Sequence, residues 1–514
     1  MFFSFVPCLI FLPEIAPQLQ AQNDAAGDSS YTLRITTQRV LLDVVVKDKK
    51  GNLIPYLSPK DFTVYEDNVV HPITSFDAPT PHAQPKPENA IVHGSADLAK
   101  IGAAPITILV LDELNTSFED MSFARQKMEK YLDTQPAILT QPTALLAVTN
   151  THFQVIEDYT QDREALRLAL KKHFPELPLK YMQSGANSSG AYERMALSLN
   201  SLHQIAVAAR GAQGRKSVIW VGKGFPAVNL LVLDNESTEV MQHAIQRLTR
   251  ELMDTRMTLY TIDPAANLLT HGFVATPDEL TEFESRTDGQ PFADEIKFST
   301  LAPATGGQAF YDRNDVDKEL REAAEEGATY YALSYAPTNH IETPGAYRHI
   351  HVVLKDPNLI AVTRNGYYVG DAEDNVFDAV KNQAKDLRTL LEEEMGSAAI
   401  ATLPYSGVGA SLAKGDGDAL TLKTTAGTLA WTPASDGKYQ AEITVLSVAF
   451  SAKGKALAHT SKELVAQVRG EVTNPELKAA FLLHLPQPVG TKRIRVVVRD
   501  AHNGKIGTAE LQLP

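Results

Sequence analysis

The feature that most constrains the fold is a long alternation of strand and helix patterns between residues 105 and 337. Short apolar runs rich in β-branched residues alternate with segments whose apolar residues recur every three or four positions. This alternation is typical of parallel strands joined by crossover helices that cover both faces of a sheet. We therefore predict an α/β fold with a doubly wound, mostly parallel sheet. The expected strands are 106–112, 143–150, 151–159, 216–224, 257–263, 306–312 and 329–337.

Two of the expected helices have well-defined apolar faces. The face of segment 121–133 consists of Met121, Ala124, Met128, Tyr131 and Leu132. The face of segment 160–174 consists of Leu166, Ala169, Leu170 and Phe174. We expect Thr160 to be the N-cap of this second helix, because its hydroxyl can accept a backbone N–H of the first turn.

The segments on either side of the α/β region predict β structure. Alternating apolar and polar residues with Gly-containing turns indicate strands before and after that region. We place the boundaries at 30–77 for an N-terminal, immunoglobulin-like β segment, 78–103 for a Pro-rich linker, 104–340 for the α/β domain, 341–370 for a β extension, 371–398 for a helical spacer and 399–514 for a C-terminal β-sandwich.

The first 21 residues resemble a signal peptide, with an apolar run followed by a small-residue cleavage site at Ala21. We therefore expect the protein to be secreted, or held in the periplasm or cell envelope. No later stretch has the 18 or so uncharged apolar residues of a transmembrane helix. The formal net charge of −14 argues against nucleic acid as a partner, because phosphate neutralisation needs a basic surface. The sequence does not indicate an oligomeric state.

The residues after the first α/β strand point to a particular family. The run "ITILVLD" ends at Asp112 and is followed by the polar turn "ELNTS" and a helical pattern. This strand, aspartate and turn resemble the start of a von Willebrand factor A domain. The resemblance extends over residues 31–369 to the secreted, acidobacterial-type VWFA-related proteins. The motifs that carry it, in order, are "VLLDVVVKDKKGNLIPYLSPKDFTVYEDN", "LDELNT", "LAPATGG", "YYALSYAPTN", "YRHIHVVL" and "TRNGYYV".

The resemblance implies a divalent metal site, but the matching positions are only partly kept. Asp112 falls on the aspartate of the family's metal loop, and Thr116 falls on its second hydroxyl position. Leu114 stands at the first hydroxyl position and offers no oxygen. Ser188 or Ser189 is the candidate for the ligand from a later loop. Gly222 and Lys223 replace the acidic residue at the end of the strand that should end in an aspartate. Because Mg²⁺ needs several converging oxygens, the pattern favours no metal over Mg²⁺ or another divalent cation.

Two interpretations of the Asp112 loop therefore stay open. In the first, Asp112, Thr116 and Ser188 form a degenerate metal site. In the second, Asp112 caps the following helix and Thr116 satisfies a backbone group in the turn. Asn115 and Glu113 could supply replacement oxygens to a metal, although Glu113 is expected to point away if the loop keeps the family's usual path.

The resemblance implies a non-enzymatic protein that binds an extracytoplasmic protein or polymer at the top of the sheet. The partner-binding candidates are Asp112, Asn115, Thr116, Ser117 and Lys223. Lys223 could receive an acidic group if the metal is lost. The alternatives are a metal-free structural or assembly module of the envelope and, with no supporting motif, an uncharacterised hydrolase.

Overall fold

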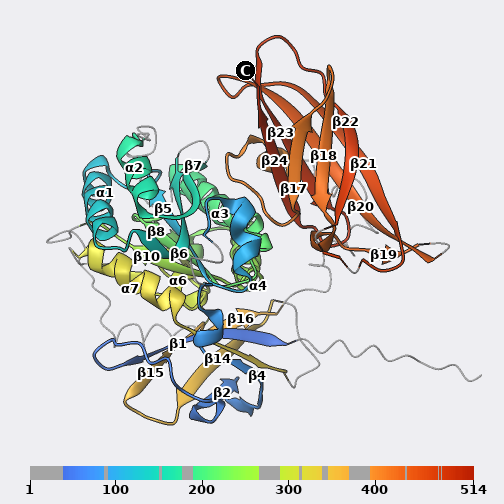
Figure 1. The fold of residues 1–514 in the computed structure, drawn as a ribbon. Helices are drawn as coiled ribbons and strands as arrows, with labels where there is room; N and C mark the ends of the chain where they lie inside the picture. Colours follow the sequence, from blue (N-terminus) through green and yellow to red (C-terminus); the bar gives the residue numbers. More distant parts are fainter. Residues whose placement is uncertain are drawn as a thin grey trace, which may run out of the picture. The chain divides into compact units, whose positions relative to one another are not determined.

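The structure, a computed structural model, describes residues 39–85, 91–149, 153–175, 189–265, 290–311, 315–337, 345–369, 394–434, 437–472, 474–475 and 477–513 (Figure 1). The signal peptide, Ser188 and residues 371–393 of the expected helical spacer lie outside these ranges. A mixed α/β fold is confirmed, and antiparallel strands make up much of it. Within the described residues, no helix has the length and apolar character needed to cross a membrane.

The central element is a six-stranded sheet with the order β12-β10-β8-β5-β6-β7. Its strands are β5 (Ile106–Asp112), β6 (Ile138–Val148), β7 (Phe153–Asp162), β8 (Lys216–Val221), β10 (Met257–Ile262) and β12 (Ala309–Phe310). All neighbouring pairs are parallel except β6 and β7, which are antiparallel. The carboxyl ends of the five parallel strands therefore meet at one edge of the sheet, which we call the top face.

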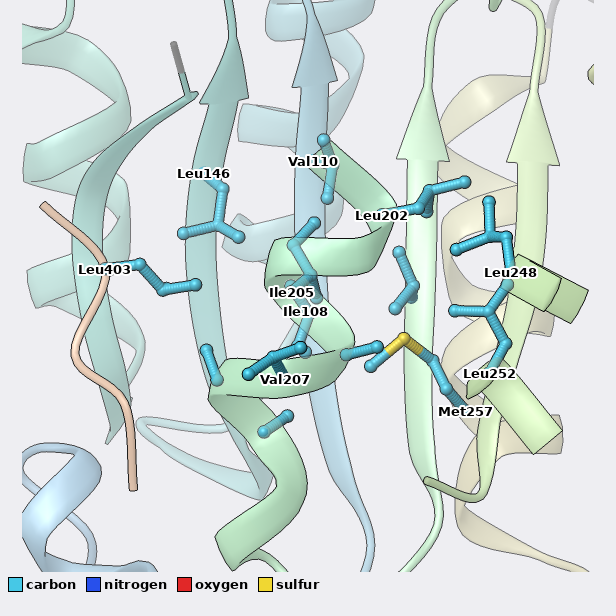
Figure 2. Packing of buried hydrophobic residues seen from close by; sticks show 14 of the residues in the cluster. Ile108, Val110, Leu146, Leu202, Ile205, Val207, Leu248, Leu252, Met257 and Leu403 are labelled. Atoms are coloured by element: carbon cyan, nitrogen blue, oxygen red, sulfur yellow. The ribbon is translucent and has the colours of Figure 1, made fainter. Parts of the chain in front are cut away.

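Helices cover both faces of this sheet (Figure 1). The helices on one face are α1 (Phe118–Asp133), α2 (Arg163–Lys172) and α7 (Val316–Ala328). The helices on the other face are α3 (Ser189–Ala208) and α4 (Asn235–Asp254). Figure 2 shows Leu202 and Ile205 of α3 in one apolar cluster with Ile108 and Val110 of β5. The short helix α6 (Leu301–Ala304) and the two-stranded sheet of β9 (Val228–Asn229) and β11 (Glu295–Ile296) complete this region.

The strand expected to close the α/β array belongs to another sheet. β13 (Tyr331–Tyr335) runs antiparallel between β1 (Val40–Asp48) and β4 (Ile73–Asp77). All five residues of β13 are buried. Its backbone therefore needs a hydrogen-bonded strand on each side. The edge strand of the central sheet, β12, has only two residues and is too short to pair with it. The α/β region therefore ends with α7, before residue 329, whereas the sequence pattern predicted residue 340.

The N-terminal β segment and the expected β extension form one module of two four-stranded sheets. Their orders are β15-β1-β13-β4 and β16-β14-β2-β3. The remaining strands are β2 (Phe62–Glu66), β3 (Val69–His71), β14 (Tyr347–Leu354), β15 (Leu359–Val362) and β16 (Gly366–Tyr368). Leu42, Phe62, Leu333 and Ile350 share one core cluster. Strands from both ends of the α/β region therefore depend on each other for burial.

The C-terminal region is a β structure with its own apolar core. One sheet contains β17 (Ala410–Lys414), β18 (Ala419–Thr425) and β22 (Lys478–His484). The other contains β19 (Thr432–Pro433), β20 (Lys438–Ser451), β21 (Ala456–Arg469), β23 (Thr491–Asp500) and β24 (Ile506–Gln512). The buried side chains of both sheets face one cluster, as the inner faces of packed sheets do.

The helix α2 differs from its expectation at both ends. Asp162 is its N-cap, and the Asp162 carboxylate accepts hydrogen bonds from the backbone N–H groups of Glu164 and Ala165. Thr160 lies in β7 instead. Phe174 lies beyond the last helical residue and is 86% exposed, so it does not continue the apolar face.

A buried ion pair links the N-terminal β module to the α/β region. Lys47 of β1 donates to the carboxylate of Glu326 in α7, whose side chain is only 2% exposed. Burial raises the pKa of Glu326, whereas the ammonium of Lys47 lowers it. Burial outweighs the effect of Lys47, so the pKa of Glu326 is raised overall, and the ion pair with Lys47 offsets part of the cost of burying this carboxylate.

We expect Lys47→Met to lower the free energy of unfolding by about 3 kcal/mol, because it leaves a buried carboxylate unpaired. The double variant Lys47→Met/Glu326→Leu should recover most of this loss, since neither charge is then buried. Urea unfolding measures both values, with Lys50→Met at an exposed position as the control. A double variant as unstable as the sum of the two single variants would contradict this account.

Candidate functional site

The carboxylate of Asp112 lies at the top face and is completely buried. Its Oδ1 atom accepts hydrogen bonds from the backbone N–H and the side-chain amide of Asn115, both at 3.0 Å. Its Oδ2 atom accepts from the indole Nε1–H of Trp220 at 3.0 Å and from the backbone N–H of Gly224 at 2.9 Å. The carboxylate therefore joins the end of β5 to the end of β8 and to the loop that follows.

The charge state of Asp112 depends on these contacts. The pKa of Asp112 is raised overall, because the effect of burial outweighs that of the hydrogen bonds from Trp220, Asn115 and Gly224, which lower it. A buried carboxylate is expensive unless donors replace the lost water. The donors here come from β8 and from the two loops at the top face, so Asp112 fixes the positions of all three segments.

The loop 222–224 can approach Asp112 closely because its two flanking residues are glycines. Gly222 has φ +148°, and a Cβ atom there would lie 2.4 Å from Cβ of Asp112 and 2.5 Å from Oγ1 of Thr116. Gly224 has φ +68°. The backbone N–H between them, that of Lys223, donates to Oγ1 of Thr116 at 3.1 Å. Thr116 thus holds the same loop as Asp112.

The cap of α1 is Ser117, not Asp112. The Ser117 hydroxyl accepts from the backbone N–H of Asp120 at 3.2 Å and donates to the Asp120 carboxylate at 2.7 Å. The expectation that Asp112 caps this helix is therefore wrong, because the Asp112 carboxylate is turned toward β8. Thr116 does accept a backbone N–H, but from Lys223, which is distant in sequence.

The neighbouring residue Glu113 lies away from Asp112, as expected. Its carboxylate pairs with Nε2 of His173 at 2.6 Å, and both side chains are buried. On the opposite side, the Asn115 amide also donates to the Ser198 hydroxyl of α3 at 3.1 Å. The end of β5 is therefore tied to helices on both faces of the sheet.

Lys223 is the charged candidate that reaches the surface. Its side chain is 40% exposed, and its Nζ atom lies 3.4 Å from the Asp120 carboxylate. Lys223 also lines a cavity of about 230 Å³ beyond the carboxyl ends of β8, β10 and β12. Thr261, Asp263, Lys297, Phe298 and Tyr311 contribute to the same wall. In α/β sheets this edge is where ligands bind.

The donor set around Asp112 does not fit a divalent cation. Both Asp112 oxygens face N–H groups, and Leu114 stands where a hydroxyl would be needed. The buried Oδ1 of Asn115 has no hydrogen-bond partner in the described part of the chain. One such oxygen is far from the six or so that a hard cation requires. No group of three or more His, Cys, Asp or Glu in the described residues is arranged to hold a metal.

The structure brings four of the predicted site residues together as two hydrogen-bonded pairs. Asn115 donates to Asp112, and the backbone N–H of Lys223 donates to Thr116. The backbone N–H of Gly224, next to Lys223, donates to Asp112 and so connects the two pairs. Burial removes Asp112 and Thr116 from direct contact with a partner, while Lys223 is accessible. Sequence reasoning missed Trp220, Gly224 and the cavity residues. The pair of glycines around Lys223 was the available signal for a close approach of backbone.

Comparisons with known proteins give no independent assignment. No protein-family model matches the chain, and no curated protein matches it. Among solved structures, human COPII-coat protein Sec24c matches with a TM-score of 0.24 and 8% identity, covering 58% of this chain and 50% of that chain. The SpRpn10 VWA domain matches with a TM-score of 0.17 and 12% identity, covering 32% and 90%. The chain spans about half of the Sec24c chain. These scores are too low to carry a functional argument.

We expect Asp112→Asn to lower the free energy of unfolding by about 3 kcal/mol, because an amide N–H₂ would face donors and leave them unpaired. Urea unfolding followed by tryptophan fluorescence measures the loss. Asp133→Asn removes the same charge at an exposed position of α1 and serves as the control. Equal stability of the two variants would show that Asp112 does not hold the top face together.

Proposed function

We propose that this protein binds an extracytoplasmic protein or polymer at its top face, through an acidic group received by Lys223 and without a divalent cation. The observation that carries the proposal is the saturation of the Asp112 carboxylate by internal donors. In the resembling family a metal in this loop receives the partner's acidic group. Here the same position is occupied by hydrogen bonds that hold the loop bearing Lys223.

The placement of Lys223 supports this role. The backbone N–H groups on either side of its Cα are fixed, that of Lys223 by Thr116 and that of Gly224 by Asp112. Its ammonium is accessible and has one carboxylate, Asp120, at 3.4 Å. An ammonium has three donors, and an exposed ion pair contributes little stability. A partner carboxylate can therefore share or replace Asp120.

The proposal includes two further inferences from the sequence, which are export from the cytoplasm and a role without enzymatic activity. A binding role requires only a positioned surface, which the loop 222–224 provides. The described cavity beside Lys223 gives the partner group a concave site instead of a flat one.

We expect poly-L-glutamate and polygalacturonate to bind the protein and neutral dextran not to bind. Lys223→Glu should weaken binding of the acidic polymers by roughly tenfold or more, since it replaces attraction by repulsion. Added salt should weaken it as well. Biolayer interferometry measures the affinities.

The control variant is Lys453→Glu, which makes the same charge change at an exposed position of the β20–β21 turn. Acidic polymers that bind equally well to the wild type and to Lys223→Glu would overturn the proposal. The β modules would then become the candidates for function.

A further inference from the structure

A second cavity lies at the amino end of β10, which is the end of the central sheet opposite the top face. Met257 and Thr258, the first two residues of β10, line it. Asp43 of β1 and Arg364, which follows β15, line it from the N-terminal β module. Arg256, the residue before β10, adds a further charged group. We call this space the arginine cavity, and it lies between the N-terminal β module and the α/β region.

The guanidinium of Arg364 has a donor that the protein leaves unused. Its Nε–H group is buried and has no hydrogen-bond partner in the described part of the chain. Burial lowers the pKa of Arg364, and the charges of neighbouring acidic groups, Asp43 and Asp254 among them, offset only part of this effect. A guanidinium stays charged even so, and buried donors in proteins normally have acceptors. The Nε–H group of Arg364 therefore calls for an acceptor that the described residues do not supply.

Arg256 brings the second guanidinium, and Asp43 holds it in place. The Nη2 atom of Arg256 donates to Oδ1 of Asp43 at 2.6 Å, whereas its buried Nε–H group has no hydrogen-bond partner among the described residues. The backbone of Arg256 has φ +53° and follows Thr255, the C-cap of α4. Glycine or asparagine usually takes this left-handed position, because a larger side chain is strained there. The contacts of the Arg256 side chain must therefore offset a strained backbone.

The charges that line the arginine cavity do not balance. Arg256 and Arg364 bring two positive charges, and Asp43 brings one negative charge. Asp254 also acts on Arg364, but it is exposed and is not among the described residues that line the cavity. One bound monovalent anion would balance the lining charges, and charge-assisted hydrogen bonds from guanidinium groups would hold it.

The size of the arginine cavity limits which anion fits. Its volume is about 30 Å³, and one water molecule needs about 10–15 Å³. A single-atom halide fits this space, whereas sulfate or phosphate, with five heavy atoms, does not. Thr258 adds a hydroxyl donor, because its Oγ1 atom accepts from Nε of Arg215 at 3.0 Å and its proton can be directed to an anion.

We propose that the arginine cavity binds one chloride ion between the guanidinium groups of Arg256 and Arg364. The site goes beyond the proposed function and is independent of it, since Lys223 lies at the opposite end of the sheet. The ion links the N-terminal β module to the start of β10. Because it binds the folded protein, it stabilises that state by mass action.

³⁵Cl NMR of the full chain tests for the ion directly, because chloride that exchanges with a protein site gives a broadened line. We expect a dissociation constant on the order of 10 mM. Bromide should remove the broadening. Sulfate at the same ionic strength should be at least about tenfold less effective, because it does not fit the cavity.

Arg364→Gln should abolish most of the broadening, because it removes a charge and the donors that hold the ion. The variant is expected to fold, since it takes a charge out of a buried position. The control variant, Arg469→Gln, removes an exposed arginine at the end of β21 and should leave the broadening unchanged.

Thermal unfolding gives an independent readout. Sodium chloride at about 300 mM should raise the melting temperature of the wild type by about 3 °C relative to sodium gluconate at the same concentration. Gluconate matches the ionic strength and is too large for the cavity. Arg364→Gln should have the same melting temperature in both salts, whereas Arg469→Gln should behave like the wild type.

Broadening that sulfate removes as well as bromide does, or that Arg364→Gln leaves unchanged, would overturn the proposal. Equal melting temperatures of the wild type in chloride and gluconate would also overturn it, and the cavity would then hold water. The comparisons of sulfate with bromide and of chloride with gluconate use the wild type, so they do not depend on the folding of a variant.

Discussion

The top face depends on one buried carboxylate. Asp112 accepts hydrogen bonds from Asn115, Trp220 and Gly224, and so ties the ends of β5 and β8 to the loop 222–224. Without these donors the charge would be costly to bury. Asp112 itself is buried and cannot contact a partner, whereas the side chain of Lys223 is accessible. The cavity beyond β8, β10 and β12 borders the same loop.

Local sequence patterns correctly predicted the elements whose burial depends on residues that are close together in the chain. The buried residues of α1 are the five predicted from helical spacing, Met121, Ala124, Met128, Tyr131 and Leu132. The strand ending at Asp112 is buried throughout, as its apolar run indicated. Periodicity succeeds here because each pattern reflects which faces of the element are packed, one face for α1 and both faces for β5.

Other features required information that is distant along the chain. β13 is buried throughout, and its aromatic and apolar residues with one serine, Ser334, are compatible with either sheet. Only pairing with β1 and β4 decides its place. The role of Asp112 depends on Trp220 and Gly224, more than 100 residues later, which no local signal connects to it. The cavity likewise combines side chains that follow three separate strands.

The most direct test of a metal-free, hydrogen-bonded Asp112 is metal titration of a Trp431→Phe protein, in which Trp220 is the one tryptophan left. Its fluorescence during thermal unfolding reports on the site itself. With millimolar Mg²⁺ or Mn²⁺ and with chelator, the account predicts the same emission and melting temperatures equal within about 1 °C. A metal-dependent rise of several degrees that Asp112→Asn abolishes would contradict it.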